Sequence, residues 1–134
     1  MEITVRHLGD VQFEAEARGH RVVCDQPLDN SGYDEGMSPP EFLLVSLGTC
    51  AGFYVAQYLN AHSLVCPGLE IKVAAEKAQQ PARLGSFRIE VIAPMLDPEH
   101  EAGVLRAVHK CLIHNTLLNP PQIETVVHCG ALQS

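Results

Sequence analysis

The sequence predicts an α+β fold in which an antiparallel sheet packs with two main helices. Three patterns support this prediction. Short stretches of alternating polar and apolar residues, typical of strands, occur on both sides of the middle of the chain. Residues 42–55 form a long stretch without charge, and residues 97–117 carry an apolar stripe of helical period. The expected order is three strands, a long helix, two strands, a second helix and a last strand.

The first three strands are predicted from alternation near the N-terminus. Residues 3–7 and 11–15 each alternate apolar and polar side chains, and the turn residues 8–10 between them predict a hairpin. Residues 21–24 extend this sheet as a third strand. Residues 25–37 contain Pro, Asn, two Gly and four acids, and this composition predicts an exposed loop.

The long helix is predicted over residues 38–60. Ser38 suits the cap, Pro39 suits the first helical position, and Glu41 completes a capping box. The uncharged stretch that follows is apolar on every face, so the helix is expected to be central and buried within protein. It is interrupted by Gly and shorter than the roughly 18 apolar residues of a membrane span. One small sheet covers only one side of such a helix, so we expect a second copy of the chain to cover the rest.

The second half of the chain predicts a hairpin, a helix and a final strand. Residues 69–78 and 87–91 alternate in the same way as the first strands and are expected to pair antiparallel. An Asp-Pro start predicts a helix over residues 97–117, with Cys111 on or beside its apolar stripe. Two prolines end this helix, and residues 123–129 are predicted as the last strand.

Length and charge limit the classes of function. The 134 residues suit a single domain, expected to span residues 1–134. Nine Lys and Arg stand against 16 Asp and Glu, a net charge of −7 without a basic cluster, which argues against nucleic acid or membrane lipid as partners. The N-terminus lacks the apolar region of a signal peptide, so we expect a cytoplasmic protein with reduced thiols.

The five cysteines do not suggest a disulfide framework or a metal centre. Their number is odd, and no two form a C-x-x-C motif. His109, Cys111 and His114 lie close in sequence, but only Cys111 and His114 are spaced to share one helix face. Tetrahedral metal sites need more clustered ligands. We therefore predict neither a metal nor another cofactor.

Two cysteine-containing segments resemble those of a known family. The run GYDEGMSPPEFLLVSLGTCAGFYVAQYL, residues 32–59, resembles the segment around the first cysteine of the OsmC/Ohr family, the osmotically induced and organic hydroperoxide resistance proteins. The run CLIHNTL, residues 111–117, looks like the second cysteine segment of that family. The two segments occur in the family's order, and the order of elements agrees over almost the whole length. The resemblance therefore implies an OsmC-like fold and an intertwined homodimer.

The resemblance also implies a thiol peroxidase. Cys50 would attack an organic hydroperoxide as its thiolate, Cys111 would resolve the sulfenic acid as a disulfide, and a dithiol would reduce the pair. An apolar helix raises the pKa of a thiol, so the thiolate needs compensation. In the family an arginine held by a glutamate supplies it, and Glu41 and Arg6 are the best matches by position. Arg18 and Arg21 are alternatives to Arg6.

The sequence departs from the family pattern at two places. Leu112 stands where the family usually has proline, directly after the second cysteine. Glu41 lies nine residues before Cys50, whereas the better characterised peroxidases tend to have ten. One residue turns a helix by about 100°, so the glutamate is expected to point in a different direction. These departures place the chain closer to the less studied OsmC-like branches.

Other interpretations of the same residues remain open. A cysteine on an apolar helix is often a small buried hydrophobic residue, and Glu41 is explained by the capping box alone. The fold would equally suit a protein that binds a small hydrophobic ligand without turnover. A third hypothesis is an interaction module whose acidic loop, residues 25–36, binds a partner.

Overall fold

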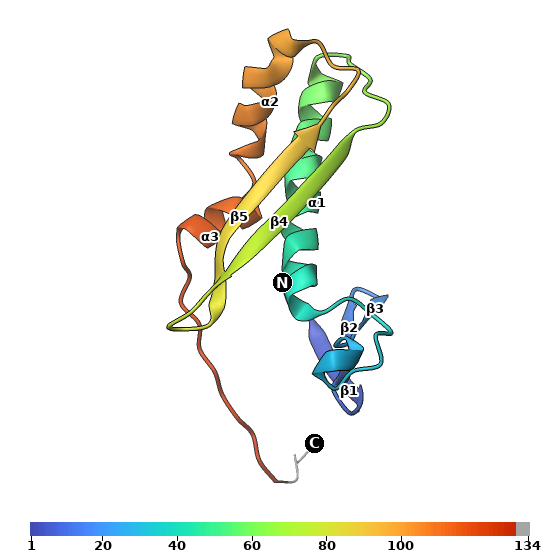
Figure 1. The fold of residues 1–134 in the computed structure, drawn as a ribbon, viewed down its shortest axis with the longest axis vertical. Coiled ribbons are helices and arrows are strands. Elements are labelled where there is room, and N and C mark those ends of the chain that lie inside the picture. Colours follow the sequence, from blue (N-terminus) through green and yellow to red (C-terminus); the bar gives the residue numbers. More distant parts are fainter. Residues whose placement is uncertain (131–134) are drawn as a thin grey trace.

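A computed structural model describes residues 1–130 and contains two antiparallel sheets and three α-helices. In Figure 1 the hairpin of β4 (Glu70–Ala78) and β5 (Arg83–Ile92) crosses α1 (Pro39–Ala61), and α2 (Glu101–Val108) lies beside α1. The three-stranded sheet lies beyond the N-terminal end of α1, where the chain leaves it to enter the helix. This arrangement confirms the predicted α+β class.

The three-stranded sheet consists of β1 (Thr4–Gly9), β2 (Gln12–Ala17) and β3 (His20–Cys24), as the alternation predicts. The register pairs Val5 with Ala15 and Ala15 with Val22, so apolar side chains share one face. That face is open to solvent, since Val5 is 60% exposed and Val22 is 45% exposed. Within one chain this sheet has an apolar surface without a cover.

The loop after β3 is more ordered than its composition predicts, because it folds around a buried carboxylate. Asp25 is completely buried. It accepts hydrogen bonds from the backbone N–H groups of Gln26, Tyr33 and Glu35 and from the side chain of Gln12. Burial raises the pKa of Asp25, but these hydrogen bonds outweigh it and hold the pKa below its ordinary value. The charged carboxylate therefore organises the loop that leads to α1.

The start of α1 is the one predicted. Ser38 is the N-cap, its backbone N–H donates to Glu41 Oε1 at 3.0 Å, and its hydroxyl donates to the same oxygen at 2.9 Å. The buried face of α1 is formed by small and aliphatic side chains: Leu47, Gly48, Ala51, Val55 and Leu59. The opposite side carries Phe53, which is 56% exposed. Within a single chain only one face of α1 is buried, as expected for a helix that one small sheet cannot cover.

The hydrophobic core lies between α1, α2 and the β4–β5 hairpin. Ala51 and Val55 of α1 pack with Val104 and Val108 of α2, and inward side chains of both strands cover them. Gly48 permits the close approach of β4, because a Cβ there would lie 2.9 Å from a methyl group of Val73. The outer face of the hairpin is mainly polar and charged.

The second predicted helix is wrong as one continuous element. A short 3-10 turn (Pro98–His100) precedes α2, and the chain then breaks before α3 (Leu112–Leu118). The break lies at Cys111, whose φ of −56° and ψ of 125° are extended rather than helical. Cys111 instead caps α3, because its sulfur accepts a hydrogen bond from the His114 N–H at 3.4 Å.

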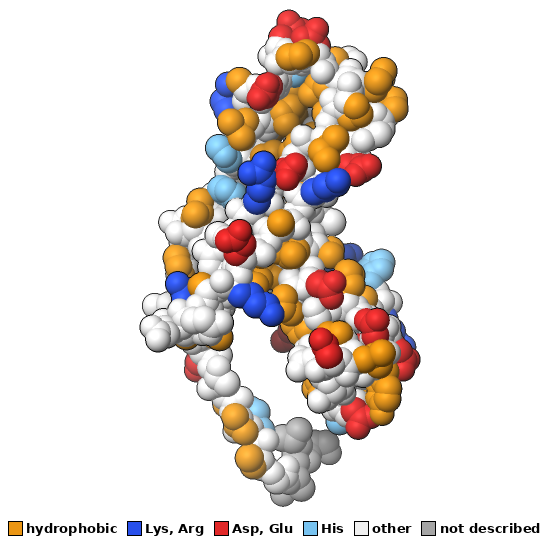
Figure 2. Space-filling view, in the orientation of Figure 1, with side chains coloured by type: hydrophobic (Ala, Val, Ile, Leu, Met, Phe, Trp, Pro, Cys, Tyr) orange, Lys and Arg blue, Asp and Glu red, His pale blue; other side chains and the backbone are white. Residues whose placement is uncertain are grey.

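The predicted last strand, residues 123–129, is also wrong for the single chain. After α3 the chain has no regular structure up to residue 130, and Figure 1 shows it running away from the body of the molecule. A strand needs a neighbouring edge, and within residues 1–130 none lies beside this segment. Its apolar side chains are exposed, Ile123 at 86% and Val127 at 77%. Figure 2 shows hydrophobic side chains on this segment and on the small sheet.

The prediction that the long helix is too short to span a membrane is wrong by length. At 23 residues, with a mean hydropathy of 1.5 over its best window, α1 is long and apolar enough to cross a membrane by length and composition alone. Core helices of globular folds meet the same test. Within residues 1–130, α1 contacts β4, α2 and α3, and its Ala51, Val55 and Leu59 side chains belong to the hydrophobic core.

Candidate active site

The two cysteines of the predicted redox pair lie together where α1 meets the start of α3. Cys50 is half-buried near the middle of α1, and Cys111 is completely buried. The break between α2 and α3 brings Cys111 and the first N–H groups of α3 against Cys50. The fold therefore brings two cysteines that are sixty-one positions apart in sequence next to each other.

The surroundings of Cys50 favour its thiolate. Partial burial raises the pKa of Cys50, but hydrogen bonds from the Cys111 thiol and from the backbone N–H groups of Ile113 and Leu112 outweigh it, and the pKa is lowered. Burial raises the pKa of Cys111. The hydrogen bond that its S–H group donates to Cys50 raises this pKa further. These surroundings therefore favour the thiolate on Cys50 over the thiolate on Cys111.

The departure from proline at position 112 has a physical consequence. Proline has no backbone N–H, whereas Leu112 donates its N–H to Cys50. Leu112 is the first residue of α3, the position at which proline is otherwise well tolerated. Leucine at position 112 therefore gives the Cys50 sulfur one more hydrogen-bond donor than proline would.

Glu41 and Arg6 do not reach the thiol pair within one chain. The Glu41 carboxylate binds Ser38 at the start of α1, and these hydrogen bonds lower its pKa. Nine residues separate Glu41 from Cys50, roughly 13 Å along a helix. Arg6 on β1 pairs with Glu16 at 3.4 Å, in the sheet beyond the N-terminal end of α1.

The alternatives to Arg6 are also remote from Cys50. Arg21 pairs with Glu16 at 3.4 Å from the other side, so Glu16 binds both arginines across the sheet. Arg18 occupies the tight turn between β2 and β3 with a positive φ of 52°. Among residues 1–130, the groups that lower the pKa of Cys50 are neutral donors, and none is an arginine.

The remaining cysteines show no comparable environment. Burial and the charge of Asp25 raise the pKa of Cys24, which disfavours a reactive thiolate. Cys66 is half-buried and Cys129 is exposed, and all five cysteines are free. Residues 1–130 contain no group of three or more His, Cys, Asp or Glu side chains that would hold a metal ion.

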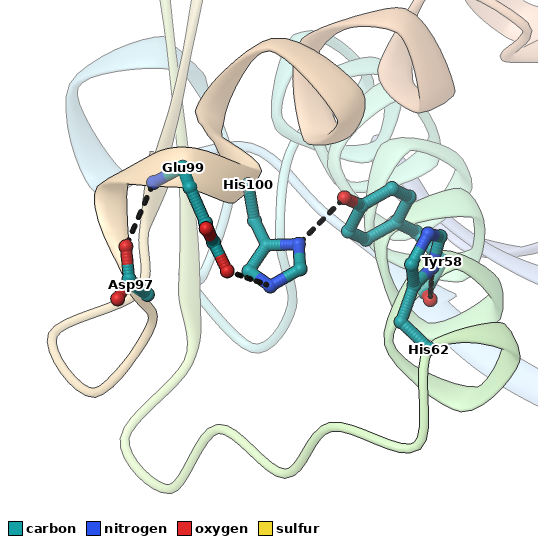
Figure 3. Close-up of polar contacts among 5 residues, drawn as sticks. All are labelled: Tyr58, His62, Asp97, Glu99 and His100. Atoms are coloured by element: carbon teal, nitrogen blue, oxygen red, sulfur yellow. Dashed lines mark hydrogen bonds and ion pairs between the residues drawn. The ribbon is translucent and has the colours of Figure 1, made fainter.

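Sequence patterns alone did not reveal a second polar cluster, between α1 and the start of α2. The Tyr58 hydroxyl lies 2.8 Å from His100 Nδ1, and His100 Nε2 lies 3.5 Å from a carboxylate oxygen of Glu99 (Figure 3). With the Nε2 proton directed at Glu99, Nδ1 accepts the proton of the tyrosine hydroxyl. The His62 ring stacks on Tyr58 with centroids 4.0 Å apart. Forty-two residues separate Tyr58 from His100, so no local motif signals their contact.

Comparison with known proteins agrees with this architecture. Residues 32–126, most of the chain, match the family described as OsmC-like protein. Among curated proteins, none matches the chain. Solved structures share the fold at low sequence identity. A Psychrobacter arcticus protein assigned to osmotic stress and detoxification responses has a TM-score of 0.78 at 21% identity, with 85% of both chains covered.

Two further structures extend the comparison. An OsmC-like protein from Mycoplasma pneumoniae has a TM-score of 0.73 at 20% identity, covering 89% of this chain and 87% of the other. An organic hydroperoxide resistance protein OsmC from Legionella pneumophila has a TM-score of 0.60 at 15% identity, covering 87% of both chains. The family match extends over both cysteine segments and over the helices that join them, and so this chain belongs to the OsmC-like protein family.

Proposed function

We propose that this protein is a thiol peroxidase that reduces organic hydroperoxides through Cys50 and Cys111. The observation that carries the proposal is the hydrogen-bonded pair itself. Cys50 is held as the better thiolate by three neutral donors, and its main side-chain donor is a second, buried cysteine. A cysteine that served only as a small buried hydrophobic residue would have no need of such donors.

The chemistry requires two steps within the chain and one external reductant. The Cys50 thiolate attacks the hydroperoxide, a sulfur–oxygen bond forms, the O–O bond breaks, and the alkoxide takes a proton and leaves as the alcohol. Cys111 then attacks the sulfenic acid of Cys50, which forms the disulfide and releases water. A dithiol reduces the disulfide by exchange. The raised pKa of Cys111 disfavours its thiolate while Cys50 is still reduced.

The organic substrate class is supported by similar structures that are named organic hydroperoxide resistance proteins, among them the one from Legionella pneumophila. A hollow of about 530 Å³ between α1 and β4 is lined mainly by aliphatic side chains and glycine, among them Leu44, Val45 and Val73. Neither cysteine of the pair lines this hollow. The same hollow is the observation that favours the second candidate, a protein that binds a small hydrophobic ligand without turnover.

Assembly into a homodimer is part of the proposal. One chain leaves three apolar surfaces open: the Phe53 side of α1, the Val5 face of the small sheet, and the segment 123–127. A second copy would cover them and would offer the C-terminal segment a strand edge. Any catalytic role of Arg6, Arg18, Arg21 or Glu41 would depend on this assembly, because none of them touches Cys50 within the chain. The cytoplasm supplies the reducing conditions that the dithiol step needs.

The test is peroxide consumption by the reduced protein with a dithiol present, using cumene hydroperoxide and hydrogen peroxide separately. The wild type should lose two thiols, form a Cys50–Cys111 disulfide detectable by mass spectrometry, and react faster with cumene hydroperoxide. Cys50→Ser should abolish consumption, and Cys66→Ser is the matched control that should retain it. Consumption by Cys50→Ser at the wild-type rate would refute the proposal. Unchanged thiols in the wild type would favour the ligand-binding alternative.

A further inference from the structure

Beyond the thiol pair, α1 and α2 enclose a second hollow of about 410 Å³. This volume lies in the range of roughly 300 to 1,000 Å³ typical of small-molecule sites. Polar and aromatic side chains line it from α1, from α2 and from the residues that follow each helix: Tyr54, Gln57, Tyr58, His62, Arg106 and Lys110. Its lining includes neither cysteine of the candidate active site, so the hollow is a separate feature of the fold.

The charge of this hollow is opposite to that of the chain. The protein carries 16 acidic and 9 basic residues, yet two basic side chains and no acidic one line the hollow. Arg106 lies in the last turn of α2 and Lys110 lies in the turn that follows this helix, and both side chains line the hollow. Within residues 1–130 neither forms an ion pair with a carboxylate. Two positive side chains that line one hollow without a paired carboxylate favour the binding of an anion there.

Contacts around Tyr58 fix the aromatic wall of the hollow. His100 hydrogen bonds the Tyr58 hydroxyl and is itself paired with Glu99, while His62 stacks on the Tyr58 ring (Figure 3). His62 Nδ1 also donates to the Tyr58 backbone carbonyl at 2.9 Å. Gly103 permits close helix contact, since a Cβ there would lie 2.5 Å from the Tyr58 hydroxyl oxygen. A wall held in this way needs little reordering when a ligand binds.

We propose that this hollow binds a small organic carboxylate. A guanidinium presents its N–H groups as a planar fork that matches a carboxylate, and Lys110 adds a second positive charge. The rings of Tyr54 and Tyr58 provide an apolar surface for the body of the ligand. Inorganic phosphate would use the charges but not the rings, which is why a carboxylate on an apolar body fits better. The site does not depend on peroxidase activity.

The experiment is a titration of the full-length, reduced protein with benzoate, followed by two-dimensional amide NMR. Saturable shifts are expected in the last turns of α1 and in α2. Arg106→Gln and Lys110→Gln should each weaken binding by roughly tenfold or more, since each removes a charge-assisted hydrogen bond. Arg88→Gln is the matched control, because Arg88 is an exposed arginine of β5 that pairs with Glu90, and it should bind as the wild type does.

Two further ligands complete the test. Benzamide has the same ring without the charge and should show no saturable shifts, while inorganic phosphate should bind more weakly than benzoate. The proposal is overturned if benzoate does not saturate the wild-type shifts, or if Arg106→Gln binds it equally well. Phosphate binding as tight as that of benzoate would overturn the assignment to an organic carboxylate. Unchanged amide spectra elsewhere in the variants establish that they fold.

Discussion

The β4–β5 hairpin and the β1–β3 sheet are built from similar alternating sequences, but only the hairpin has its apolar face covered within the chain. Its inward side chains pack on α1 and join the core with Val104 and Val108. The apolar face of the β1–β3 sheet remains open, with Val5 60% exposed. Alternation therefore specifies a two-faced strand in both places, but it does not specify what covers the apolar face.

The same contrast divides the residues of the candidate active site. Cys50 and Cys111 lie in the half that is complete within one chain, and they are joined by hydrogen bonds. Arg6, Arg18 and Arg21 lie on the open sheet, away from the thiols. The thiol pair is assembled within one chain. If a second copy covers the β1–β3 sheet, the rest of the candidate site depends on the dimer. Each of the following predictions tests one side of this difference.

The largest effect is expected from charges placed on the open apolar surfaces. Val126→Asp combined with Val127→Asp should weaken the homodimer by roughly 30-fold or more, the effect of losing an interface hot spot. Analytical ultracentrifugation over a range of concentrations measures it. Val65→Asp is the matched control, because Val65 is 86% exposed in the turn before β4. Equal dimerisation of the double variant and the wild type would show that the C-terminal segment is not buried by a second copy.

The next largest effect is expected in the core between α1, α2 and the β4–β5 hairpin, which is complete within one chain. Leu47 is 1% exposed on the buried face of α1, so Leu47→Ala should lower the free energy of unfolding by about 2 to 5 kcal/mol. Leu28→Ala, at an exposed leucine, should change it by less than about 0.5 kcal/mol. Urea denaturation of the monomeric double variant gives both values without a contribution from assembly. Similar losses at the two positions would contradict the assignment of this face to the core.

Local signals were sufficient for much of this fold. The start of α1 follows from Ser38 and Glu41, which form the capping box that the sequence predicts. Strands β1, β2, β4 and β5 follow from alternation between turns, and β3 follows from a short run after the second turn. In these places the decisive contacts join residues close in sequence. The family resemblance was confirmed by the match over residues 32–126.

Features that depend on distant contacts were not predictable in this way. The apolar stripe of residues 104–113 continues across the position where the helix breaks, and neither Gly nor Pro marks the break at Cys111. Cys111 leaves the helix where it contacts Cys50 on another element. Asp25 appeared as one more acid in a loop, yet it is buried because four donors surround it. The predicted last strand, residues 123–129, does not form because one chain supplies no strand edge with which it can pair.

A smaller effect tests whether the thiol pair is preassembled. Cys111→Ala removes the main side-chain donor to Cys50, so the pKa of Cys50 should rise and less thiolate should form at neutral pH. The pH dependence of iodoacetamide alkylation at Cys50, followed by mass spectrometry, measures this shift. Cys111→Ser retains a hydroxyl donor and should stay nearer the wild type, and Cys66→Ala should not move the profile. The same rise should occur in the monomeric double variant, since both cysteines belong to one chain.

The smallest effect isolates a single backbone donor. Leu112→Pro removes the N–H that Leu112 donates to Cys50, while proline suits the first position of α3. The pKa of Cys50 should therefore rise, but less than in Cys111→Ala, because the donors on Cys111 and Ile113 remain. Leu112→Ala loses the same exposed side chain but keeps the N–H, so its alkylation profile should match the wild type. A profile for Leu112→Pro that coincides with that of Leu112→Ala would mean that this N–H contributes nothing to the thiolate, and that Cys111 and Ile113 alone lower the pKa.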